Sequence, residues 1–159
     1  MAEQKDLLQA QKVFATFCAA MDADDWNYKK DEEKLRIECG ARGDDLPIEL
    51  NISVDADRQL LMVLSQMPVV TPEDKRLDVA VAVSVVNNQL VNGYFDYDVK
   101  SGKMFFRMVN TIRDSVIGKE LCAYMLYVSC KTVDEYNDKF LMLAKGILSL
   151  EQFLAAENK

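Results

Sequence analysis

Hydrophobic and polar residues change their spacing several times along the chain, and each change predicts a new element. Leu7, Ala10, Phe14, Phe17 and Met21 recur every three or four positions. This spacing gives a helix with one apolar stripe. The chain therefore opens with an amphipathic helix.

Strict alternation follows. Apolar and polar residues alternate over 35–39 and again over 48–54, and a turn is predicted between them at 40–45. Alternation indicates a strand with one solvated face. The segment 60–67 is apolar on both faces, which predicts a central or helix-covered strand.

The segment 71–90 carries conflicting signals, because its valines at 79, 81, 83 and 85 alternate as in a strand. Against this, Thr71 suits a helix N-cap and Pro72 suits the first helical position. Leu77, Val81 and Asn88 also fall on one helical face. We predict a helix over 72–90.

Residues 93–110 predict a β-hairpin that turns at Ser101-Gly102, since glycine readily takes a positive φ. This register places Asp96 opposite Arg107 as an opposite-charge pair. A three-residue turn would place Asp96 against Phe106, so the two-residue turn, or a four-residue loop with the same register, is preferred. Six apolar side chains then share one face: Phe95, Tyr97, Val99, Met104, Phe106 and Met108.

The second face of this hairpin is not fully polar. Tyr94, Phe105 and Val109 lie on it and are covered by a helix of the same chain, by another chain, or by nothing. We select these three residues as candidates for a patch that faces a second copy or another partner.

Helical spacing resumes at Gly118 and continues to the end of the chain, which predicts a long C-terminal helix. Thr132 and Glu135 have the form of a capping box and offer a break near Lys131, and Gly146 offers another. The predicted fold class is α+β, in the order helix, three antiparallel strands, helix, β-hairpin and long C-terminal helix. Residues 1–159 are expected to form a single domain.

The charge balance argues against several partners. The chain has 26 acidic and 19 basic residues, a formal charge of -7. This field repels phosphate backbones and anionic lipid, so neither nucleic acid nor a membrane is an expected partner. The N-terminal residues lack signal-peptide features and no apolar run is long enough to span a bilayer, so a cytoplasmic location is expected.

Catalytic chemistry is limited by the absence of histidine, which excludes Ser-His-Asp and Cys-His nucleophile systems. Cys18, Cys39, Cys122 and Cys130 fall in apolar segments without C-x-x-C spacing, which favours reduced core thiols over disulfides or a zinc site. No cofactor or metal is expected, and we do not expect an enzyme.

Two acidic patterns have simple explanations. Asp22, Asp24 and Glu33 match positions 1, 3 and 12 of a calcium loop, but positions 5 and 6 lack the ligand and the glycine, which favours a solvated turn. Asp96 and Asp98 could serve acid–base catalysis, whereas the arginine opposite Asp96 favours a role in setting the strand register.

The stretch NNQLVNGYFDYDVKSGKMFFRMVN, residues 87–110, resembles the YbjN-like proteins. It has an Asn-rich helix end, an acidic strand, a glycine turn and a returning aromatic strand. The predicted element order over about 5–156 resembles the fold that these proteins share with type III secretion chaperones. The resemblance implies a small acidic protein, commonly a homodimer, that holds another polypeptide or acts in regulation.

The leading interpretation is therefore a non-enzymatic protein-binding module, chaperone-like or regulatory, that acts as a homodimer and presents a sheet surface or groove to a protein segment. The alternative is a small-molecule sensor or minor enzyme with a pocket between sheet and helices. A purely structural role in a larger assembly cannot be distinguished from the first interpretation by sequence.

Overall fold

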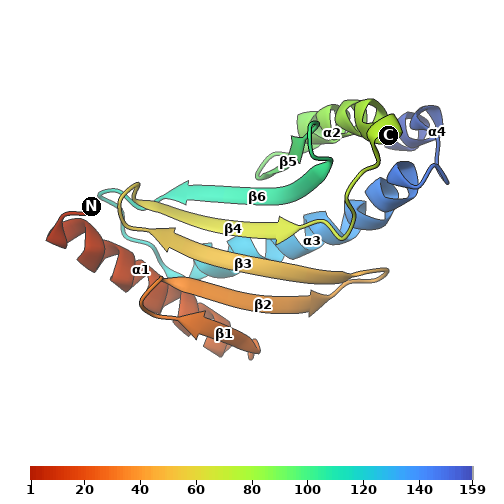
Figure 1. Cartoon of the computed structure of the whole chain (residues 1–159). Coiled ribbons are helices and arrows are strands. Elements are labelled where there is room, and N and C mark those ends of the chain that lie inside the picture. Colours follow the sequence, from red (N-terminus) through yellow and green to blue (C-terminus); the bar gives the residue numbers. More distant parts are fainter. Residues whose placement is uncertain (159) are drawn as a thin grey trace.

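The computed structural model describes residues 1–158, which form a six-stranded antiparallel sheet and four α-helices (Figure 1). The strand order is β1-β2-β3-β4-β6-β5. The elements are α1 (Gln4–Ala23), β1 (Tyr28–Asp31), β2 (Arg36–Arg42), β3 (Pro47–Asp55), β4 (Leu60–Gln66), the 3-10 helix η1 (Glu73–Lys75), α2 (Arg76–Gln89), β5 (Tyr94–Asp98), β6 (Lys103–Thr111), α3 (Lys119–Ala144) and α4 (Leu150–Glu157). The α+β class and the predicted order of the main elements are confirmed.

The first half of the sheet has one strand more than predicted. β1 is a four-residue edge strand that pairs with β2, with Tyr28 opposite Cys39. Its sequence, YKKD, has too few apolar residues to show alternation, and only the pairing with β2 makes it a strand. β2 also continues through Gly40 to Arg42, so the turn begins later than predicted.

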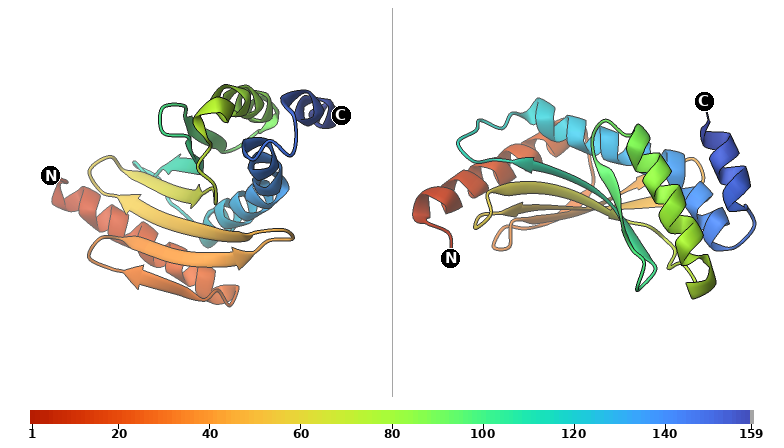
Figure 2. Two further views of the ribbon diagram at one scale, coloured as in Figure 1. Left: turned by 45° about the vertical axis from the view of Figure 1, so that its right-hand side comes forward. Right: turned by 90° about the horizontal axis from the view of Figure 1, so that it is seen from above.

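Two of the helices cover one side of the sheet, and the other two flank its β5 end. α1 and α3 lie behind it in Figure 1, and α2 and α4 lie at its β5 end, as the two views of Figure 2 also show. Strand side chains that point toward these helices are almost completely buried. They include Ile37, Leu50, Ile52, Leu61, Val63, Phe106 and Met108, none more than 2% exposed.

Phe95 connects the hairpin to the helical layer. Its ring meets the rings of Phe106, Tyr136 and Phe140 edge to face, with centroid distances of 5.2, 5.8 and 5.0 Å. Phe140 in turn stacks on Phe153 of α4 at 5.6 Å. Such aromatic pairs each contribute about 0.5–1.5 kcal/mol beyond their buried area. This cluster therefore joins β5, β6, α3 and α4.

The predicted hairpin register is wrong by two residues. Phe95 pairs with Phe106 and Asp98 with Lys103, which leaves a four-residue loop, 99–102. A shift of two preserves the faces, because side chains alternate with a period of two. Five of the six predicted apolar side chains therefore share the helix-facing side, and Val99 lies in the loop, 41% exposed. Arg107 reaches Asp96 diagonally, with Nη2 2.6 Å from Oδ2.

Asp98 is the reason for the longer loop. Its carboxylate accepts hydrogen bonds from the backbone N–H of Lys100 and the hydroxyl of Ser101, and the Ser101 bond lowers the pKa of Asp98. Gly102, at φ +75, then packs against Thr71, where a Cβ would lie 2.3 Å from the carbonyl oxygen. The hydrogen bonds that Asp98 accepts within the loop therefore favour a four-residue loop over the simple two-residue turn.

The helix predicted over 72–90 is confirmed as η1 followed by α2. The predicted cap is wrong, because Thr71 is buried and its N–H donates to the Gly102 carbonyl. Leu77 and Val81 are on the exposed side of α2, 75% and 45% exposed. The buried side is formed by Val79, Ala82, Val83 and Val86.

The C-terminal helix is broken, and the break is at the second of the two predicted points. α3 ends at Ala144, Gly146 takes φ +71, and α4 begins after Ser149. The hydroxyl of Ser149 accepts from the N–H of Gln152 in a complete capping box. Thr132, the alternative break, is buried inside α3.

One edge of the sheet is closed by a side chain. Asn87 of α2 accepts a hydrogen bond from the N–H of Phe95 at 2.8 Å and donates to its carbonyl at 2.9 Å. The amide of Asn87 therefore replaces a neighbouring strand on β5. Capping the edge in this way hinders pairing with a foreign strand.

We predict that Asn87→Ala destabilises the protein by about 1–3 kcal/mol, since two backbone groups of β5 lose their partner. Asn88→Ala is the matched control, because Asn88 is the exposed neighbour on the same helix and the helix propensity changes equally. Urea unfolding of both variants measures the difference. Equal midpoints for the two variants would show that the Asn87 bonds do not stabilise the fold.

Candidate protein-binding surface

The bare face is the side of the sheet opposite α1 and α3. It consists of the outward-pointing side chains of the six strands, and it faces the viewer in Figure 1. None of the helices in residues 1–158 lies across it (Figures 1 and 2). It is therefore a sheet surface that the protein's own helices leave open.

The apolar side chains of the bare face gather on β4, β5 and β6. Met62 of β4 is opposite Val109 of β6, and the other apolar side chains lie beside this pair on β4, β5 and β6. Tyr94 is 43% and Val109 38% exposed, and the rest are half-buried. We call this set the apolar patch: Leu60, Met62, Leu64, Tyr94, Phe105 and Val109.

All three residues selected from the sequence lie in this patch. Tyr94, Phe105 and Val109 point to the bare face, where no described helix covers them. The three β4 members were missed. The sequence signal for them was the apolar character of 60–67 on both faces, from which we predicted a central or helix-covered strand. β4 is central, as predicted, but only one of its faces is covered.

Arg107 lies in the middle of the apolar patch. Along β6 it sits between Phe105 and Val109, and across the sheet it is opposite Leu64 on one side and Tyr94 on the other. Within residues 1–158 the guanidinium donates only to Asp96, and its buried Nε has no partner. Most of the hydrogen-bonding capacity of this arginine is therefore unused.

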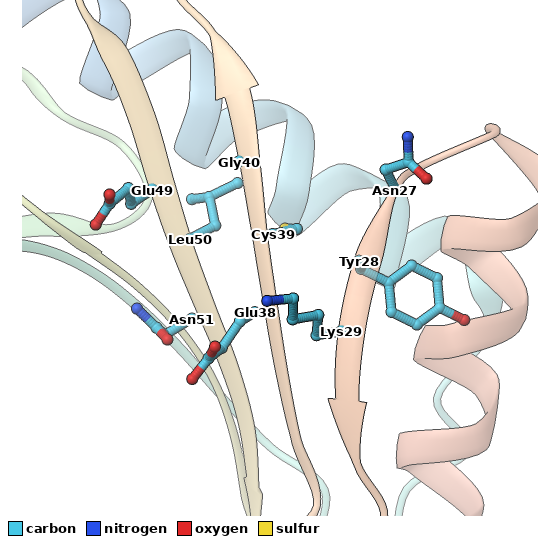
Figure 3. Close-up of a pocket in the computed structure, with 9 residues that line it drawn as sticks. All are labelled: Asn27, Tyr28, Lys29, Glu38, Cys39, Gly40, Glu49, Leu50 and Asn51. Carbon is cyan, nitrogen blue, oxygen red and sulfur yellow. The ribbon is translucent and has the colours of Figure 1, made fainter.

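Over β1, β2 and β3 the bare face is almost entirely polar. A shallow hollow of about 720 Å³ lies over β1, β2 and β3, lined among others by Lys29, Glu38 and Asn51 (Figure 3). Tyr28 and Cys39 border it from the helix side. The hollow is open and its polar groups do not converge on one point, so it provides a polar rim next to the apolar patch.

Charges of both signs are balanced on the bare face. The basic residues that point outward from the strands are Lys29, Arg36, Arg42, Lys103 and Arg107. The acidic ones are Asp31, Glu38, Glu49, Asp55, Asp96 and Asp98. Five bases and six acids give this face a charge of -1, whereas the whole chain carries -7. The acidic excess therefore lies on the rest of the molecule.

Burial disfavours the thiolate form of the four cysteines. Burial raises the pKa of Cys39 to about 12 and the pKa values of Cys122 and Cys130 to about 11. Burial also raises the pKa of Cys18. All four cysteines are free. Within residues 1–158, no three Cys, Asp or Glu side chains are placed to hold a metal ion.

A second hollow, of about 440 Å³, lies between α1 and the β1–β2 hairpin, where Phe14, Cys18 and Leu35 form part of its wall. The polar groups at its rim bind one another. Tyr28 donates to Asp22 at 2.8 Å, and Lys30 is 2.6 Å from Glu32. These groups are already engaged, which leaves few of them to orient a small molecule.

Comparison with known proteins shows the fold. No family model and no curated protein matches the sequence. Among solved structures, YbjN from E. coli, a candidate transcription regulator, aligns with a TM-score of 0.56 at 10% identity, over 78% of this chain and 87% of YbjN. A chain of the HopA1–SchA chaperone–effector complex aligns with a TM-score of 0.53 at 12% identity, over 87% of this chain and 99% of that one.

The fold is therefore the YbjN-like, type III secretion chaperone-like fold that the sequence resemblance implied. The two solved structures named above are a candidate regulator and a chaperone–effector complex, and neither name describes an enzyme. No helix in residues 1–158 combines the length and hydropathy of a membrane span.

We predict that the thiols of the native protein react slowly with Ellman's reagent at pH 8. A thiol pKa of about 11 leaves on the order of one thiolate in a thousand at this pH, compared with a substantial fraction at the ordinary pKa of about 8.5. The same protein in guanidinium chloride is the control and should react roughly a hundredfold faster. A thiol that reacts equally fast in both states would reveal an activated cysteine.

Proposed function

We propose that this chain is a non-enzymatic protein-binding module, chaperone-like or regulatory, that acts as a homodimer in the cytoplasm. Its bare face is the contact surface, with Tyr94, Phe105 and Val109 among the contact residues. The observation that carries this proposal is the apolar patch on a sheet face without helix cover.

The composition of the bare face supports a protein contact. An apolar centre with aromatic and methionine side chains and an arginine, surrounded by a charged rim, is typical of protein interfaces. Contiguous apolar patches of this kind are uncommon on surfaces that only meet water. The chaperone–effector complex with the same fold is a further support, because one member of such a complex binds another protein.

Catalysis has less support. The chain has no histidine, its thiols have raised pKa values, and the carboxylates of the bare face are open to solvent. Asp96 is held by Arg107, and Asp98 by its own turn. Both carboxylates thus have structural partners, which fits the register-setting role better than acid–base catalysis.

Photo-crosslinking in cells tests the proposal. A benzoylphenylalanine at Val109 is expected to give a covalent protein adduct, because this position lies within the apolar patch. The control is the same residue at Tyr127, which is 63% exposed on α3 and away from the bare face. Adducts from Val109 should exceed those from Tyr127 several-fold. Equal labelling from both positions, or none from either, would contradict a protein contact on the bare face.

A further inference from the structure

We propose that the bare face binds a segment of another protein in which one carboxylate, from an aspartate or a glutamate, lies between large apolar side chains. The carboxylate binds Arg107, and the apolar side chains cover the apolar patch around it. This inference rests on the proposed function and names the chemistry of the segment that the bare face recognises.

Arg107 is the charged group at the centre of the apolar patch. Across the sheet it lies between Leu64 and Tyr94. Along β6 it lies between Phe105 and Val109. A segment that covers the patch also removes water from the guanidinium, most of whose N–H donors have no acceptor within residues 1–158. Donors that lose water without gaining an acceptor weaken binding, so a purely apolar segment fits this surface poorly.

The charged groups around the patch offer donors, whereas most of their acceptors are already used. Both oxygens of Asp98 accept hydrogen bonds within its own loop, and Oδ2 of Asp96 accepts from Arg107. Lys103, on the outward side of β6, takes part in none of the ion pairs within residues 1–158. A segment that reaches this region therefore meets two cations with free donors, and Oδ1 of Asp96 as the acceptor left over. This local excess of cationic donors is complementary to a carboxylate.

The charge of the whole chain limits how acidic the segment can be. The chain carries -7 and repels a strongly acidic partner. A single carboxylate in contact with Arg107 is attracted locally, while charges farther away than about 8 Å are largely screened at physiological salt. The chemistry that fits is therefore one carboxylate within an apolar segment, and not an acidic tract.

The spacing of side chains on β6 sets the spacing expected in the partner. Phe105, Arg107 and Val109 are successive outward residues of one strand, about 7 Å apart. Residues two apart in an extended segment, or three or four apart in a helix, are separated by a similar distance of about 5–7 Å. The recognised segment accordingly has large apolar residues within a few positions on each side of its aspartate or glutamate.

Selection from a random peptide library tests the inference. Phage-displayed peptides of about 12 residues, about 40 Å long when extended, are selected on the purified wild-type protein. The bound peptides should carry an aspartate or glutamate with large apolar residues on both sides. Selection on Arg107→Gln should lose the preference for the acidic residue. Selection on Arg36→Gln, the control, should keep it, because Arg36 is an exposed arginine of β2 outside the apolar patch.

A double-mutant cycle then measures the contact itself. The tightest selected peptide, and the same peptide with its carboxylate replaced by an amide, are titrated by fluorescence anisotropy. The amide should weaken binding to the wild type roughly tenfold or more, and binding to Arg107→Gln less than about twofold. The amide peptide should bind both proteins about equally, which also shows that Arg107→Gln remains folded.

Several results would overturn the inference. These are selected peptides without an acidic residue, an equal loss of affinity for both proteins when the carboxylate is removed, and a selection that yields no peptide. The Val109 crosslink tests the proposed function separately. A protein adduct at Val109 together with any of these results keeps the protein contact and discards the carboxylate. An adduct formed only with a second copy of the chain also overturns the inference, since that contact occupies the bare face.

Discussion

A strand places its side chains alternately on two faces, and this chain has helices to cover only one of them. α1 and α3 lie on the same side of the sheet, and α2 and α4 join that layer at its β5 end. The apolar residues of β4 and β6 cannot all turn to the helices, because neighbouring residues in a strand point in opposite directions. The apolar patch follows from this geometry, and on the covered side the aromatic cluster around Phe95 joins β5 and β6 to α3 and α4.

The edges of the sheet direct contacts toward its face. At one edge the Asn87 side chain occupies the backbone groups of Phe95, and at the other Lys29 and Lys30 lie on a strand of only four residues. Side-chain capping, charge and short length are all devices that discourage the addition of a foreign strand. A protein partner therefore gains more from the broad apolar patch than from pairing with either edge strand.

The sequence predicted the elements better than their pairing. Periodicity located α1, β3 and β4, because each segment has enough apolar residues to define its period, whereas the valines of α2 alternate as in a strand and gave a conflicting signal. β1 has too few, and the hairpin register depended on the Asp98 side chain and on the docking of Gly102 against Thr71, a long-range contact that local pattern does not encode. Similarly, Tyr94, Phe105 and Val109 could be selected from alternation alone, whereas the β4 members required the knowledge that helices cover only one side.

The position of Arg107 links register to function. A two-residue error in the hairpin leaves the paired strand residues on their predicted faces, so the face pattern alone does not require the observed register. The register does decide the neighbours of Arg107: it sets Tyr94, and not Asp96, directly opposite the arginine, and the ion pair becomes diagonal. A diagonal pair leaves part of the guanidinium and one carboxylate oxygen unused within an apolar surround. Polar groups with unused hydrogen-bonding capacity in an apolar surface form their strongest interactions with a partner that supplies the opposite charge and excludes water.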